Sequence, residues 1–74
     1  MIEAKHIRAA RALLRMKQGE LAAASGVSLG CIKNVEREKV QPLASTMAAL
    51  IGALTERGID FIDGDDGVFV GKVI

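Results

Sequence analysis

Apolar residues recur at intervals of three and four in two long stretches of the chain. Ile7, Ala10 and Leu14 share one side of a helix that is expected to run from about residue 3 or 4 to residue 15. The second stretch predicts a helix from about residue 44 or 46 to residue 57. Its apolar side is formed by Met47, Leu50, Ile51 and Leu54. Gly58 follows this helix and is a favourable C-terminal stop.

Two shorter helices are predicted between them, over residues 18–24 and 29–37, joined by one tight turn. Gly26 falls where this turn needs a positive φ, which costs glycine least. Ser28 can accept a hydrogen bond from the first turn of the second short helix and so cap it. Pro42 disfavours a helical residue before it, so a linker is expected to end there.

The tail of the chain, residues 58–74, changes from helical to strand periodicity. Residues 59–62 and 68–74 are rich in β-branched and aromatic side chains, and the segment 63–67 has the composition of a hairpin loop. An isolated hairpin is marginally stable in water, so we expect it to pack on the preceding helix or to extend across a dimer. The last strand would otherwise be an exposed apolar edge.

The size and composition of the chain limit what it can be. Its 74 residues and mass of 7.8 kDa leave room for one domain. A chain of this size buries only about 60% of its unfolded surface, and so small a core favours self-association. Half of the residues are hydrophobic but only two are aromatic, which suits short, closely packed helices. No apolar run approaches the ~20 residues that span a bilayer, and no signal-peptide pattern is present, so a cytoplasmic protein with no membrane contact is expected.

The net charge is +1, but the two parts of the chain differ in sign. Residues 1–42 hold eight Lys or Arg and four Glu, a net charge of +4. Residues 43–74 hold two basic and five acidic residues, a net charge of −3. A basic half beside an acidic half is what attraction to phosphates requires, and ordinary solvated surface charge is the alternative.

The two short helices also carry a specific pattern of residue types. A glutamine opens the first helix, Leu-Ala follows one turn on, Gly-Val lies in the turn, and an isoleucine and a final glutamate follow. These residues are Gln18, Leu21, Ala22, Gly26, Val27, Ile32 and Glu36. With residues 7–14 as a first helix, the pattern resembles the Xre or lambda-repressor-like family over residues 7–54. The resemblance implies a mainly α, lambda-repressor-like helix-turn-helix bundle of four helices, and the C-terminal β-hairpin departs from the all-helical version of the family.

The same resemblance implies a sequence-specific DNA-binding transcriptional regulator. Residues 1–57 would form its DNA-binding domain, with the motif at residues 18–37, and we expect a homodimer that represses from a short palindromic operator in double-stranded DNA. In such motifs the second helix enters the major groove and its first residues meet base edges. The residues expected at the DNA are Gln18, Ser28, Leu29, Gly30, Lys33 and Asn34, flanked by Lys17, Arg37 and Lys39. Gln18 would donate to a phosphate or read a base edge.

Different roles follow for these side chains. Asn34 has the amide that can bond an adenine in two places, and Leu29 can contact a thymine methyl group. Ser28 and the amides after it form a helix N-terminus suited to one phosphate. Lys33 and the flanking basic residues suit phosphates better than bases. Leu29 and Gly30 stand where the family often has polar readers, so direct reading of bases is expected to be sparse.

Arg11 lies on the buried side of the first helix, where an unpaired guanidinium is costly, so it needs a partner. The resemblance supplies one, because an Arg at this place commonly pairs with a Glu at the end of the recognition helix, here Glu36. We therefore expect a structural ion pair that holds the recognition helix on its scaffold. A loose surface pair is the alternative.

The sequence shows no catalytic constellation, and we expect no enzyme, cofactor or metal site. It has one His, one Cys, no Gly-rich phosphate loop and no paired carboxylates in a plausible cleft. His6 is expected to face solvent. The acidic segment 63–67 superficially resembles a calcium loop but lacks its fifth-position ligand and its final Glu, which favours a hairpin turn. Cys31 is either a small, partly buried filler or a redox-sensitive thiol at the DNA face.

A second hypothesis is a protein-interaction module, either antitoxin-like or a co-regulator. In it, the helix-turn-helix is a retained scaffold and residues 59–74 add a strand to the sheet of a partner protein. The acidic and apolar composition of the tail supports this hypothesis.

Overall fold

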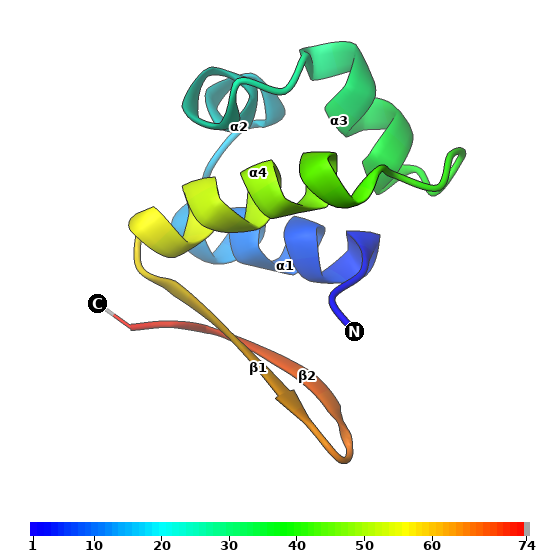
Figure 1. Ribbon diagram of the computed structural model, residues 1–74. Helices are drawn as coiled ribbons and strands as arrows, with labels where there is room; N and C mark the ends of the chain where they lie inside the picture. The colour runs from blue at the N-terminus through cyan, green and yellow to red at the C-terminus, as the bar shows by residue number, and fades with distance from the viewer. Residues whose placement is uncertain (74) are drawn as a thin grey trace.

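The secondary structure follows the order that the hydrophobic pattern predicts (Figure 1). The structure, a computed structural model, describes residues 1–73. Its elements are α1 (Ala4–Leu14), α2 (Gln18–Ser25), α3 (Leu29–Glu36), α4 (Ala44–Glu56), β1 (Ile59–Gly64) and β2 (Gly67–Lys72). The predicted small, mainly helical domain of four helices with a C-terminal antiparallel hairpin is therefore confirmed. Within residues 1–73, every helix is too short or too polar to cross a membrane.

The helices surround one core. α1 and α4 lie side by side, with α2 and α3 on one side of the pair and the hairpin on the other (Figure 1). The buried apolar residues are Ile7, Ala10, Leu21, Ile32, Val35, Leu50, Ala53, Leu54 and Ile59. Each buried Leu or Ile contributes about 1.5–3 kcal/mol relative to exposure, so this cluster holds the helices together. Leu14, Met47 and Ile51 are only partly buried and pack at its border.

The turn between α2 and α3 is held by three short-range features. Gly26 adopts a left-handed conformation with φ 77°, as predicted. The Ser25 hydroxyl donates to a carbonyl of α2 at 2.7 Å and accepts from the backbone N–H of Val27 at 3.1 Å. The Ser28 hydroxyl accepts from the N–H of Cys31 at 3.2 Å, which confirms the predicted cap of α3. These bonds set the direction in which α3 leaves α2.

Two side chains fold back over the starts of α1 and α2. The Glu20 carboxylate accepts from the backbone N–H of Lys17 at 2.9 Å, so α2 is capped although Lys17 has no acceptor to offer. At α1, the backbone N–H of Glu3 donates to His6 Nδ1 at 2.7 Å. His6 is only 9% exposed, and the expectation that it faces solvent is wrong. Its ring turns back to satisfy the helix start and is covered there.

The hairpin has a tighter turn than predicted. Gly64 pairs with Gly67, so only Asp65 and Asp66 form the turn, in place of a five-residue loop over 63–67. Gly67 has φ 123°, a backbone conformation that residues with a Cβ atom rarely adopt. Gly67 thus lets the ladder continue to the turn. Of the predicted last strand, Ile74 lies outside the described residues.

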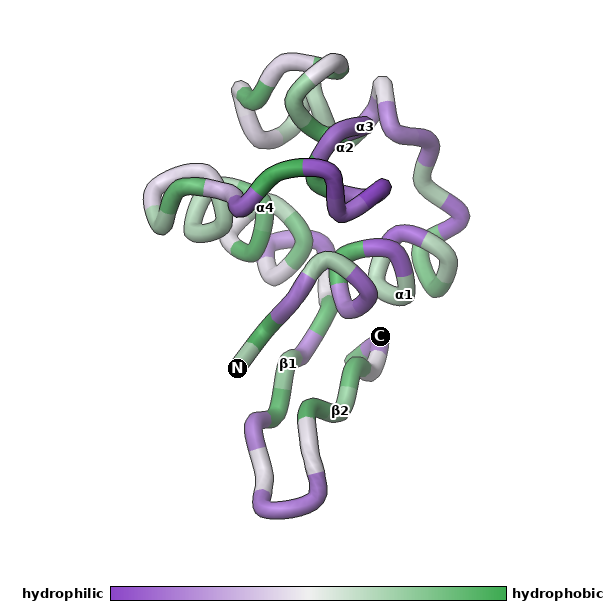
Figure 2. The backbone as a smooth tube through the Cα atoms, turned by 90° about the vertical axis from the view of Figure 1, so that its right-hand side faces the viewer, coloured by the Kyte–Doolittle hydropathy of each residue, from purple (hydrophilic) through white to green (hydrophobic). Residues whose placement is uncertain are grey.

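The hairpin packs against two helices. β1 contacts α4, as predicted, but β2 contacts α1, which the sequence did not indicate. Ile59 is buried, and Phe61 and Val70, a cross-strand pair on the same face, pack against the core. Figure 2 shows apolar strands beneath the helices and a hydrophilic tip pointing away from them. The hairpin is therefore attached by the ends of its strands nearest the helices, and its tip extends into solvent.

Candidate functional site

Arg11 and Glu36 join α1 to the end of α3. Arg11 Nε donates to Glu36 Oε2 at 2.7 Å, and Arg11 Nη2 donates to Glu36 Oε1 at 2.6 Å. The Glu36 side chain is 4% exposed and that of Arg11 is 20% exposed. The predicted structural ion pair is present, and it is bidentate and mostly buried rather than a loose surface pair. Such planar two-bond contacts restrict orientation as well as distance.

This pairing sets the charge state of Glu36. Burial on its own would raise the pKa of the carboxyl group, but hydrogen bonds from Arg11 and then Gln18, with the nearby positive charges, bring it below its usual value. The Arg11 pKa is raised by its hydrogen bond to Glu36, which outweighs the effect of burial. Both groups are therefore charged over the whole physiological pH range.

Arg8, one turn before Arg11, adds a second link to the same end of α3. Its guanidinium donates to the backbone carbonyl of Glu36 through Nη1, and Nη2 lies 3.5 Å from the Glu38 carboxylate. Arg11 also donates to the carbonyl of Met16 at 2.9 Å, in the connection between α1 and α2. We call Arg8, Arg11, Gln18 and Glu36 the clamp, because together they tie α1, α2 and α3.

Gln18 belongs to this clamp, which sequence reasoning missed. Its Nε2 donates to Glu36 Oε1 at 3.1 Å, and the residue is half-buried. The sequence prediction placed Gln18 at the DNA, and one of its two N–H groups is instead used inside the domain. The sequence held one indication of this contact. A buried carboxylate such as that of Glu36 can accept more hydrogen bonds than one arginine donates, so a further donor is needed.

α3 has two sharply different sides. Ile32, Val35 and Glu36 are buried against the domain. The opposite side exposes Ser28, Leu29, Gly30 and Asn34, and Leu29 is 39% exposed although apolar. Cys31 lies at the border of this side, and Lys33, one turn after Leu29 and Gly30, lies within it; both are half-buried. The exposed residues of α3 therefore lie on one continuous side of a short, firmly held helix.

Four basic side chains lie in α3 or in the segments that flank α2 and α3 along the chain. Lys17 precedes α2, Lys33 lies in α3, and Arg37 and Lys39 follow α3. All are exposed except Lys33. Within residues 1–73, none of the four forms an ion pair, whereas Arg8 and Arg11 do. Arg8 and Arg11 thus hold the helices together through ion pairs, whereas the charges of the other four residues are not paired within the described part of the chain.

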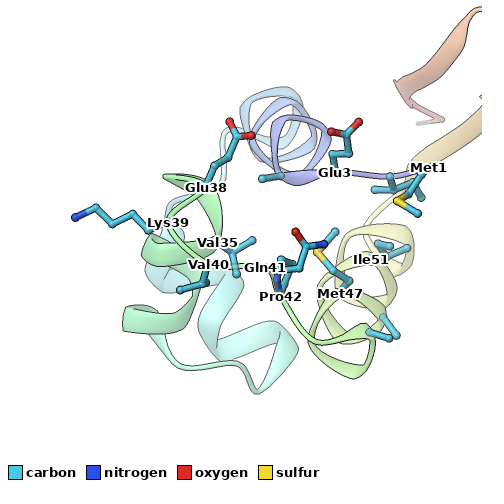
Figure 3. A pocket seen from close by; sticks show the side chains of 14 residues that line it. Met1, Glu3, Val35, Glu38, Lys39, Val40, Gln41, Pro42, Met47 and Ile51 are labelled. Atoms are coloured by element: carbon cyan, nitrogen blue, oxygen red, sulfur yellow. The ribbon is translucent and has the colours of Figure 1, made fainter.

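A groove of about 710 Å³ lies between the first residues of the chain, the connection from α3 to α4, and α4 (Figure 3). Met1, Val40, Pro42, Met47 and Ile51 supply apolar surface to it, and charged groups at its rim come from Glu3, Glu38 and Lys39. The sequence did not predict this groove, because it forms only where three distant segments meet.

The described residues form no cluster of metal ligands. Within residues 1–73, no three His, Cys, Asp or Glu side chains gather in a way that could hold a metal ion. Cys31 is a free thiol, half-buried at the border of the exposed side of α3.

No protein-family model matches the chain, and the search of curated proteins found no match either. The function is therefore argued from the residues themselves.

Proposed function

We propose that this protein is a helix-turn-helix DNA-binding domain of the Xre or lambda-repressor-like type, with α2 and α3 as the motif and α3 as the recognition helix. It would act in the cytoplasm as a transcriptional repressor, and we propose no catalytic role. The observation that carries the proposal is the division of α3. Glu36 binds one side of it to the scaffold, and the other side carries the exposed residues Ser28, Leu29, Gly30 and Asn34 with the half-buried Lys33.

In this proposal the start of α3 enters the major groove. Ser28 and the amides after it bind a phosphate at the helix N-terminus, and Asn34 reads an adenine through two hydrogen bonds. Leu29 contacts a thymine methyl group. Gly30 has no atom within 4 Å of the position that a Cβ would occupy, so the backbone there is open to close approach by DNA.

The cations around α3 supply affinity rather than specificity. In the proposed complex, Lys17, Lys33, Arg37 and Lys39 bind phosphates on either side of the major groove of the DNA. Four neutralised phosphates per copy give a salt dependence with a slope of about −3.6 in log K against log salt, and a dimer about twice that. Gln18 keeps one amide N–H for a phosphate while the other holds Glu36.

The clamp gives the recognition helix a defined orientation. Because α3 has only 8 residues, its ends are not held by helix propensity, and the contacts of Glu36 with Arg11 and Gln18 hold its C-terminal end. In a homodimer the two recognition helices would lie about 34 Å apart, one turn of DNA, and would read a short palindromic operator.

The experiment is selection of bound fragments from random DNA at two salt concentrations, followed by footprinting of the best site. A two-fold symmetric site whose affinity falls steeply with salt supports a dimeric DNA-binding regulator. Weak binding that is independent of sequence would contradict it. Asn34→Ala is the variant to run beside the native chain, since its side chain is exposed and its loss leaves the core intact.

A second candidate function, a protein-interaction module of antitoxin or co-regulator type, is favoured by one observation on the hairpin. Ile62 and Phe69 are 55% and 61% exposed, and they are cross-strand partners on the face away from the helices. In this reading the hairpin binds a partner protein. A chain that shows no DNA preference but is recovered with one stoichiometric protein would favour it over DNA binding.

A further inference from the structure

The hairpin carries an apolar face that its own domain leaves uncovered. Alternate side chains of a strand point to opposite faces, and Ile59, Phe61 and Val70 use the face toward the helices. Ile62 and Phe69 lie directly opposite each other on the outer face, and both are more than half exposed. Large apolar side chains that lie together and exposed on one face are a mark of an interaction surface.

The outer edge of β2 also has unpaired backbone groups. The N–H of Val73 donates to the carbonyl of Gly58, in register with the ladder between the strands. Since alternate residues direct their backbone groups to the same side, Phe69 and Gly71 face β1, and residues 68, 70 and 72 face away from it. The sheet has two strands, so within residues 1–73 no strand covers this edge. Such an edge is a template for another strand.

We propose that this edge pairs with β2 of a second copy of the chain, antiparallel and with Phe69 opposite Phe69. The inference rests on the proposed function, because it supplies the dimer that a palindromic operator requires. It joins two hairpins into a four-stranded sheet. A row of apolar side chains, Ile62 and Phe69 from each copy, then crosses its outer face.

The residues along β2 favour this register. With Phe69 on the two-fold axis, Val68 lies opposite Val70 of the second copy and Gly67 lies opposite Gly71. Lys72, the only cation of the hairpin, comes opposite Asp66 of the second copy, twice in the dimer. Aromatic pairs, β-branched pairs and opposite charges are the cross-strand pairs that stabilise antiparallel sheets. Charge and shape are therefore complementary between two identical edges.

The edge of β1 lacks this complementarity. Its charged residues, Asp60 and Asp63, are both acidic, so self-pairing of β1 would bring like charges together. Asp63 also lies 3.0 Å from the N-terminal amine of Met1, which places the start of the chain beside that strand. β2 is thus the edge suited to a second copy.

The first test is the dissociation constant of the dimer, measured by sedimentation equilibrium on the full chain without DNA. Val70→Pro removes an outward N–H from each copy, and Val70→Ala shortens the same side chain but keeps the N–H. We expect Val70→Pro to raise the dissociation constant at least about 30-fold and Val70→Ala by less than about 3-fold. Circular dichroism checks that both variants are folded. Equal effects of the two variants would overturn the proposal.

A charge exchange tests the register without altering the backbone. Lys72→Asp and Asp66→Lys should each weaken the dimer about 10-fold, and the double variant should return to within about 3-fold of the native value. Asp65→Lys is the matched control, because it makes the same change one residue away. If Asp65→Lys is rescued by Lys72→Asp as well as Asp66→Lys is, the register is wrong.

Disulfide formation tests the same register if a variant fails to fold. In a Cys31→Ser background, Phe69→Cys places two thiols at a pair whose Cα atoms are about 4.5 Å apart, within disulfide range. Ile62→Cys is the control, since three strand spacings, about 14 Å, separate its two copies. We expect rapid cross-linking of the first and none of the second. The reverse result would overturn the proposal.

These measurements separate the dimer from DNA binding. A native chain that stays monomeric overturns self-pairing. The outer edge of β2 would then be left to pair with a strand of a different protein. In that case an operator half-site bound by the monomer would still support the proposed function. A chain that dimerises as described but prefers no DNA sequence would instead leave the dimer standing and contradict the proposed function.

Discussion

Glu36 accepts two hydrogen bonds from Arg11 and lies at the end of the helix whose other side is exposed. The pair joins residues 25 positions apart and holds α3 against α1. A third bond, from Gln18, brings in the start of α2. The relationship links stability to the proposed function, because the orientation of α3 depends on a buried charge being matched.

Arg11→Met should destabilise the domain by about 3 kcal/mol, because it leaves the Glu36 carboxylate buried without its cation. The double variant Arg11→Met with Glu36→Leu removes both charges and should recover most of that loss. Urea unfolding followed by circular dichroism measures both free energies. If the single and double variants lose the same amount, the ion pair is not what Arg11 contributes.

The pH dependence of stability should carry the signature of Glu36. Its pKa is lower in the folded chain than in the unfolded chain, so its contribution is fully present above the unfolded value of about 4.3. That contribution is lost as the pH falls through the lower, folded value. Urea midpoints measured from neutral pH into this acid range should fall more steeply for the native chain than for Glu36→Gln. Parallel curves would mean that another carboxyl group is responsible.

Asn34→Ala and Lys33→Ala should affect DNA binding in different ways. Loss of the Asn34 amide should relax base preference at one position of each half-site, at a cost of about 1–3 kcal/mol on the preferred sequence alone. Loss of the Lys33 cation should weaken all sequences alike and reduce the salt slope by about 1 per copy. Titrations on matched sites at several salt concentrations distinguish the two. An equal loss on every sequence from both variants would refute these roles.

Gly30→Ala should separate stability from DNA binding. A methyl group at this position meets no atom of the domain within 4 Å, and alanine favours a helix by about 1 kcal/mol relative to glycine. The melting temperature should therefore rise. If the backbone of α3 approaches DNA here, affinity should fall despite the higher stability. Gly52→Ala is the control, since it lies within α4 and also has no atom within 4 Å of the added carbon.

The sequence by itself determined the local structure of this protein. The two long helices and the two strands were predictable from their hydrophobic periods, and the two short helices from the turn and the residue types around it. The positive φ of Gly26 and the cap at Ser28 were predictable as well. The pairing of Arg11 with Glu36 was predictable only through the resemblance to a family. The exposed residues of α3 followed from the same pattern, since their neighbours in the sequence form the buried side.

Only the tertiary structure decided which distant groups meet. It brings Gln18 and Arg8 to Glu36, and it places β2 against α1. It also forms the groove of Figure 3 from three separate segments. Hydrophobic patterning specifies that a side is buried but not which partner covers it. Hydrogen bonds and ion pairs between residues far apart in the chain depend on how the helices cross, and packing of the whole core sets that geometry.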